Sequence, residues 1–174
     1  MKTKLNILFL FTLLVGCSSM NIQTYKSTTP EFILEEYFEG KTMAYGVFEN
    51  RSSEVVRQFK VEIDGRIENG NLILNEDFTY SDGEKENRLW TIKILPDGKY
   101  EGTTNGVVGT ASGQRAGNAF NWIYIFDLVV DDTTYRVKFN DWMFLQEDGV
   151  MINRAHVTKW GFNVGNVTLA FHKP

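Results

Sequence analysis

The chain has 174 residues, a formal net charge of −4, two histidines and one cysteine. This is the length of one domain with a sizeable hydrophobic core. The acidic balance lacks the basic surface that nucleic-acid binding requires, and one cysteine excludes an internal disulfide framework. We therefore expect a single domain with no nucleic-acid partner.

A basic and then apolar leader opens the chain. Lys2 and Lys4 precede an apolar run that ends at Val15 and is too short for a membrane-spanning helix. The four residues Leu14-Val15-Gly16-Cys17 resemble the lipobox of bacterial lipoproteins. That resemblance implies cleavage of residues 1–16 as a signal peptide and lipidation of Cys17, which would be the membrane anchor. The alternative is an ordinary signal peptide with a chance cysteine.

The residue after the cysteine is Ser18 rather than Asp, as in lipoproteins that are passed on to the outer membrane. We therefore expect a protein of the cell envelope, lipid-anchored in the outer membrane and facing the periplasm. Residues 17–29 are polar and without a pattern, which is typical of a tether. Residues 30–174 are expected to form the folded domain.

One helix is predicted from Pro30 to Phe38. Thr29 is a suitable N-cap, Pro30 fits the first helical position, and Gly40 is a natural stop. The apolar residues of this segment, Phe32 and Phe38 among them, favour packing on, or plugging, the structure that follows.

The rest of the chain alternates apolar and polar residues with the period of half-buried strands. Turn pairs such as Asn69-Gly70 and Asp82-Gly83 separate the alternating runs. The sequence therefore predicts an all-β fold, an antiparallel meander closed into a lipocalin-like barrel with one short N-terminal helix. Such a barrel can hold one small ligand. The nine expected strands are near 43–50, 54–64, 70–80, 88–95, 99–112, 118–130, 133–146, 149–160 and 164–172.

The outward faces of these strands are polar. Lys60, Glu62, Arg136 and Lys138 would be costly in hydrocarbon, so a soluble barrel on a lipid tether is favoured over an outer-membrane barrel. His156 and His172 lack the spacing of a zinc site, and the glycine-rich run 102–117 lacks the Gly-Lys-Ser/Thr of a P-loop. No metal or cofactor is expected.

Charge on the apolar face marks the candidate ligand site. Arg57, Glu76 and Arg88 are in phase with the buried residues of three consecutive strands. One interpretation is an anionic headgroup site, in which an arginine grips a carboxylate or phosphate. The other is a structural Arg–Glu network inside a barrel that binds nothing. In the first interpretation the arginine lies beneath an aromatic pocket of Trp90, Tyr124 and Phe126.

A second group of candidate residues surrounds the Asp148-Gly149 turn. Asp141-Trp142 on one strand falls close to the pairing position of Arg154 on the next. The interpretations are a buried Asp–Arg tie between strands and the rim of a binding site. No catalytic constellation accompanies either group, so the sequence does not predict an enzyme.

Several short segments carry a family resemblance. They are Asn75 to Glu84, Arg88-Leu89-Trp90, Gly117-Asn118-Ala119, Asn140 to Met143, Asn153-Arg154-Ala155, and Lys159 to Phe162 followed by Val164-Gly165. Together they resemble a family of bacterial lipoproteins known as domain of unknown function 3833, over about Phe38 to Phe171. The resemblance implies a lipocalin-type barrel and a gene neighbourhood with lipid-modifying enzymes of the cyclopropane-fatty-acid-synthase kind. Asn140 departs from the Asp expected in the family.

Three functions remain open at this point. The first is a membrane-anchored lipoprotein that binds a fatty-acid-like or other apolar ligand in its barrel. The second is a structural or interaction lipoprotein with a filled barrel and an envelope protein as its partner. The third is a lipid-modifying enzyme of the barrel type. An open apolar cavity would favour the first and a packed interior the second.

Overall fold

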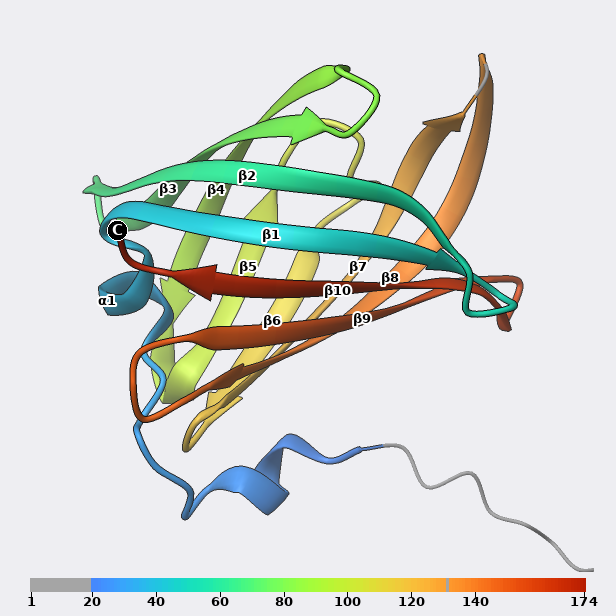
Figure 1. Cartoon of the computed structure of the whole chain (residues 1–174). Helices are drawn as coiled ribbons and strands as arrows, with labels where there is room; N and C mark the ends of the chain where they lie inside the picture. Colours follow the sequence, from blue (N-terminus) through green and yellow to red (C-terminus); the bar gives the residue numbers. More distant parts are fainter. Residues whose placement is uncertain (1–19, 131) are drawn as a thin grey trace, which may run out of the picture.

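The computed structural model describes residues 20–130 and 132–174. Ten antiparallel strands close into one barrel, each paired with its neighbour in the chain, and β1 pairs with β10 to complete the ring (Figure 1). This confirms the all-β antiparallel barrel with a short N-terminal helix. The expected leader and lipobox, with Cys17, lie outside the described residues.

The strands are long and strongly tilted around a common interior (Figure 1). They are β1 (Gly40–Asn50), β2 (Val55–Glu68), β3 (Asn71–Tyr80), β4 (Lys85–Leu95), β5 (Lys99–Thr103), β6 (Ala111–Ala116), β7 (Ala119–Val130), β8 (Thr133–Leu145), β9 (Met151–Lys159) and β10 (Phe162–His172). Two 3-10 turns, η1 (Ile22–Tyr25) and η2 (Pro96–Gly98), and the helix α1 (Leu34–Phe38) complete the elements.

The structure has ten strands because the segment expected as one strand, 99–112, is interrupted. β5 ends at Thr103 and β6 begins at Ala111. Between them, Gly106 and Gly109 have positive φ angles of 87° and 77°, which turn the chain away from the strand direction. The intervening loop stays on the barrel, since Val108 N donates to the carbonyl of Ile125 at 2.9 Å.

The N-terminal helix is shorter than predicted. It spans only Leu34–Phe38, its N-cap is Ile33, and neither Thr29 nor Pro30 belongs to it. The chain before the helix is not helical, because Phe32 N donates to the carbonyl of Gly117 at 2.8 Å instead of to a carbonyl within a helix. The Phe32 ring is fully buried, which also holds this segment in place. Of the helices among the described residues, none is long and apolar enough to cross a membrane.

The helix α1 lies across one end of the barrel (Figure 1). Phe38 packs edge-on against Phe171 of β10 with ring centroids 5.9 Å apart. The hydroxyl of Tyr100 on β5 donates to Glu35 at 2.7 Å. Gly65 on β2 allows this approach, since a Cβ there would lie 1.9 Å from the carbonyl oxygen of Phe38. We call this end the closed end.

Part of the segment expected as a tether is packed on the barrel. The Tyr25 ring lies 5.2 Å from Phe144 and 6.0 Å from Trp142 on β8. The Thr28 hydroxyl donates to Asn118 Oδ1 at 2.7 Å, in the turn between β6 and β7. The folded unit therefore includes Tyr25 and Thr28, which precede the expected boundary at residue 30.

Candidate ligand-binding cavity

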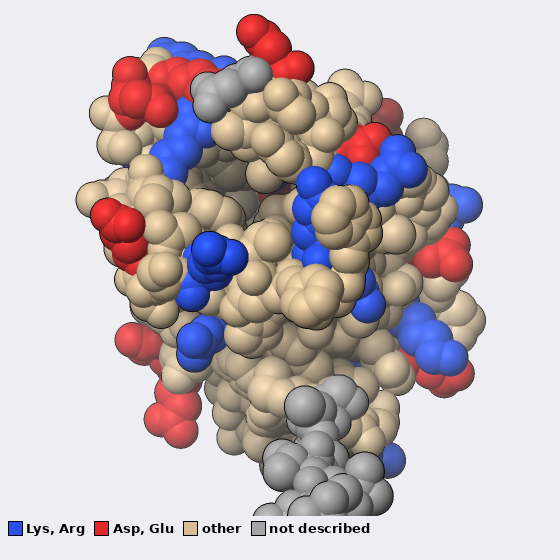
Figure 2. Space-filling model, turned by 90° about the vertical axis from the view of Figure 1, so that its right-hand side faces the viewer, with Lys and Arg blue, Asp and Glu red and all other residues tan. Residues whose placement is uncertain are grey.

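The barrel encloses a cavity of about 380 Å³. It begins at Leu34 and Phe38 on the closed end and extends to Val56, Val129 and Val130 at the opposite end. We call this opposite end the mouth; the molecule is hollowed there, with basic side chains beside the hollow (Figure 2). The β3 side chains that face the cavity are Leu74, Glu76, Phe78 and Tyr80, which is the inward half of the alternating pattern.

Aromatic rings from β4, β7 and β8 meet inside the barrel. Trp90 on β4 contacts Tyr124 on β7 edge-on, with ring centroids 5.5 Å apart. Tyr124 stacks on Phe139 of β8 at 5.0 Å, and Phe126 packs edge-on against both Tyr124 and Phe139. The structure thus brings Trp90, Tyr124 and Phe126 together, as the sequence analysis expected. Trp90 and Tyr124 face the cavity, whereas Phe126 supports Tyr124 and Phe139.

Arg88 is inside the barrel but is already paired. Its guanidinium binds both carboxylate oxygens of Glu86, with Nε–Oε1 and Nη2–Oε2 distances of 2.6 and 3.0 Å. It also lies over the rings of Phe78 and Phe126, at 4.5 and 5.0 Å from their centroids. Burial alone would lower the pKa of Arg88, but the hydrogen bonds and charge of Glu86 raise it above its usual value. Arg88 is therefore a fixed cation.

Arg57 is at the mouth. It pairs with Asp82, at an Nη2–Oδ2 distance of 3.0 Å, and with Glu84, both in the turn between β3 and β4. Its guanidinium lies 3.6 Å over the Tyr80 ring. Two carboxylates already neutralise it, so Arg57 ties two hairpins together at the entrance of the cavity.

Glu76 and Asp141 have no ion pair with any described residue. Glu76 lies opposite Arg88 in the β3–β4 register, but Arg88 binds Glu86 instead, because Glu86 lies on its own strand and face and accepts both guanidinium hydrogen bonds. The expected Arg–Glu network therefore forms with Glu84 and Glu86 rather than with Glu76. Asp141 is 4 % exposed and its contact is Asn153, not Arg154.

Both carboxyl groups titrate far above their usual range. Burial raises the pKa of Glu76 to about 7, against the opposing effects of the Arg88 charge and Trp90. Burial likewise raises the pKa of Asp141 to about 7, although hydrogen bonds from Asn153 and Tyr124 and the Arg88 charge favour its ionised form. Burial also raises the pKa of Tyr124 well above its usual value, so its hydroxyl stays protonated.

Trp142 and Arg154 lie outside the cavity. They are register partners on β8 and β9 and point to the outer face, because their strand neighbours Asp141 and Asn153 point inward. Tyr25 covers Trp142, which leaves it 5 % exposed, while Arg154 is exposed. The structure therefore does not bring these two residues together with the other candidates.

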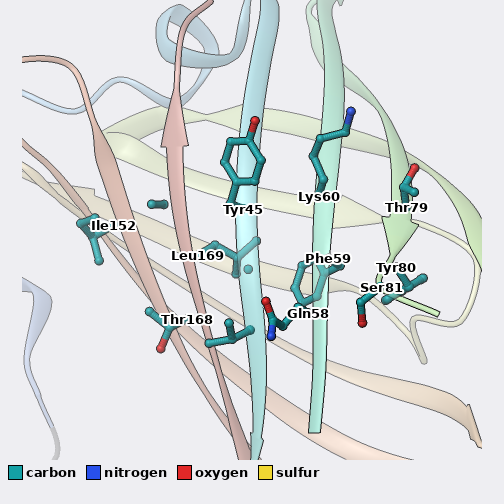
Figure 3. Close-up of a pocket in the computed structure, with 13 residues that line it drawn as sticks. Tyr45, Gln58, Phe59, Lys60, Thr79, Tyr80, Ser81, Ile152, Thr168 and Leu169 are labelled. Carbon is teal, nitrogen blue, oxygen red and sulfur yellow. The ribbon is translucent and has the colours of Figure 1, made fainter. Parts of the chain in front are cut away.

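A second hollow lies on the outer wall. It has a volume of about 480 Å³ and its centre is on β1 and β2. Figure 3 shows Tyr45, Lys60 and Thr79 extending from three neighbouring strands beside it. Ile152 of β9 and Thr168 of β10 border its other side. Tyr45 is 55 % exposed there.

Sequence reasoning missed two residues that shape the cavity. Glu86 holds Arg88, and the Tyr80 hydroxyl donates to Glu86 at 2.8 Å. A signal was present, because Glu86 and Arg88 are two residues apart and so share one face of a strand. In residues 20–130 and 132–174, no three His, Cys, Asp or Glu residues are grouped as a metal site requires.

The comparison with protein families matches residues 11–173 to a family described as "Protein of unknown function (DUF3833)". The chain belongs to this family. The match spans the barrel and the segment packed on it, in agreement with the resemblance seen in the sequence. No curated protein matches the chain. Membership in the DUF3833 family assigns no function to the chain. A function has to be inferred from the cavity.

Proposed function

We propose that the protein binds one small apolar molecule, such as a fatty-acid-like lipid, in the barrel cavity. The observation that carries this proposal is the volume of about 380 Å³ with a mainly apolar lining. Cavities of this size suit small-molecule ligands. The lining extends from α1 to the mouth, which suits an elongated molecule that enters with its apolar end first.

We also propose that lipid on Cys17 anchors the protein in the outer membrane, facing the periplasm. The support is the leader and the lipobox-like residues that end at Cys17. An apolar ligand is poorly soluble in water, so a binding protein held beside a membrane would meet it at its source.

The first test is native mass spectrometry of the protein purified from its host, followed by extraction and identification of bound molecules. A lipid at one molecule per chain is the expected result. Val167 lines the cavity and Thr168, its neighbour on β10, lines the outer hollow, so Val167→Phe and Thr168→Phe form a matched pair. Val167→Phe should reduce the bound fraction and Thr168→Phe should preserve it. Empty protein in every preparation, together with no response to a lipid panel, would contradict the proposal.

An interaction role in the envelope is the second candidate, and the outer hollow beside Tyr45 favours it. A photo-crosslinking residue in place of Tyr45 should then capture one discrete envelope protein in intact cells. The same residue in place of Lys93, on the exposed face of β4, is the control.

A lipid-modifying enzyme is the third candidate. Glu76 and Asp141 favour it, because carboxyl groups with a pKa of about 7 can exchange protons at neutral pH. Incubation of the protein with membrane lipids should then change the mass or the double-bond position of one lipid class. Glu76→Gln should abolish that change.

A further inference from the structure

Four polar side chains form a belt partway along the cavity. They are Glu76 of β3, Tyr124 of β7, Asp141 of β8 and Asn153 of β9, and all four line the cavity. Apolar neighbours flank them along each strand, as Leu74 and Phe78 flank Glu76. We call this group the polar belt. A ligand that extends past it must place some atom against it.

The polar belt has more hydrogen-bond acceptors than donors. Asn153 donates through Nδ2 to Asp141 Oδ1 at 3.3 Å, while its own Oδ1 is buried without a donor in the described structure. Asn153 is 4 % exposed, so bulk water does not satisfy this oxygen. A buried acceptor without a partner costs about 1–3 kcal/mol. The side-chain oxygen of Asn153, a residue that lines the cavity, thus has no donor among the described residues.

The belt contains two acidic groups and no basic one, and the neighbouring Arg88 already shares its charge with Glu86. The two nearest guanidiniums are engaged elsewhere, Arg88 with Glu86 and Arg57 with Asp82 and Glu84. When Glu76 and Asp141 both ionise, no cation within ion-pair distance offsets them in the described structure. A carboxylate brought to this level would add a third negative charge and no donor.

We propose that the polar belt binds a hydrogen-bond-donating group, a hydroxyl or an ammonium, carried by an otherwise apolar ligand. The donor satisfies Asn153 Oδ1 and the carboxyl groups of Glu76 and Asp141. This inference rests on the proposed ligand-binding function and specifies the ligand's polar group. A ligand carboxylate is then not expected at the level of the belt, in contrast to the interpretation of the sequence in which an arginine grips a carboxylate or phosphate.

The test uses four probes with the same twelve-carbon chain: dodecanol, dodecylamine, dodecanoate and dodecyl methyl ether. Each displaces a bound environment-sensitive dye from the full chain, below the concentration at which the probe self-associates. The alcohol or the amine should bind at least tenfold more tightly than both the carboxylate and the ether, which accepts but cannot donate. A preference for the amine identifies ammonium as the donor, and a preference for the alcohol identifies hydroxyl.

Asp141→Asn tests whether the belt causes the preference. This variant should reduce the preference to less than threefold, while Lys138→Gln, on the exposed face of the same strand, should leave it unchanged. Thermal unfolding checks that both variants fold. If Asp141→Asn does not fold, Glu76→Gln takes its place in the test. Equal binding of all four probes, or tightest binding of dodecanoate, overturns the inference and leaves the proposed function standing. Failure of every probe to bind overturns both.

Discussion

Two acidic residues, Glu76 and Asp141, lie inside the barrel, where most side chains are apolar. Glu76 lies on an inward face between Leu74 and Phe78, and Asp141 lies between Phe139 and Met143. Desolvation of both carboxyl groups raises their pKa values to about 7. Keeping these groups inside therefore costs folding stability at neutral pH.

Glu76→Gln should make the folded state less sensitive to pH. The pKa of Glu76 is about 7 in the folded state against an ordinary 4.5, so its contribution is fully present below pH 4.5 and declines as the pH rises to 7. Removing the carboxyl group should raise the free energy of unfolding at pH 8 by up to about 3 kcal/mol. Urea unfolding at pH 5 and pH 8 measures this difference.

Glu101→Gln is the control, because Glu101 is exposed on β5 and the substitution there should leave the pH dependence unchanged. The same loss of stability between pH 5 and pH 8 in the Glu76 variant and the parent would contradict the prediction.

Among the elements, α1 covers one end of the barrel in the described structure. It covers the closed end through Phe38, and the Tyr37 hydroxyl donates to the carbonyl of Gly149 at 3.2 Å. Gly65 is what lets the helix backbone come this close to β2. Five helical residues are too few to be stable alone, so packing against the strands must hold them.

Gly65→Ala should therefore destabilise the protein more than a typical glycine substitution in a strand. The added Cβ meets backbone rather than a movable side chain, and such overpacking costs about 1–3 kcal/mol. The urea midpoint should fall accordingly. Thr91→Ala, on the exposed face of β4, should change stability by less than about 1 kcal/mol. An unchanged midpoint in Gly65→Ala would show that α1 can be displaced without cost.

For the whole molecule, the alternation of the sequence was enough to predict the barrel. It also placed Arg57, Glu76 and Arg88 on inward faces, because side chains of a strand alternate and the apolar neighbours define the phase. The same rule shows that Trp142, one residue after Asp141, faces the other way.

The rest of the site depends on information that the alternation does not contain. Glu76 lies opposite Arg88 on the neighbouring strand, and Glu86 lies two residues before it on the same strand. The rotamer of the Arg88 side chain decides which of the two it binds, and the alternation of the sequence does not specify that rotamer. The split of 99–112 into two strands and the late start of α1 arise from contacts with distant segments, such as Phe32 with Gly117. Cavity volume is the space left by all the side chains together, so no single segment predicts it.

Cys17→Ser tests the expected anchoring of the whole molecule. Without the thiol there is no site for lipid, so the protein should move from the membrane fraction to the soluble fraction in its host. Fractionation followed by detection of the barrel measures this change, and Ser18→Ala is the matched control that should stay with the membrane. Retention of the Cys17 variant on the membrane would contradict the lipobox interpretation.

The contacts of Tyr25 and Thr28 limit how far the barrel can lie from residue 17. Thr28 binds Asn118 in the turn between β6 and β7, and Tyr25 packs on Phe144 of β8. From Cys17 to Ile22 the backbone can span at most about 18 Å. A lipid on Cys17, as proposed, would therefore keep the barrel close to its own bilayer, because only a short stretch of chain separates Cys17 from the part packed on the barrel.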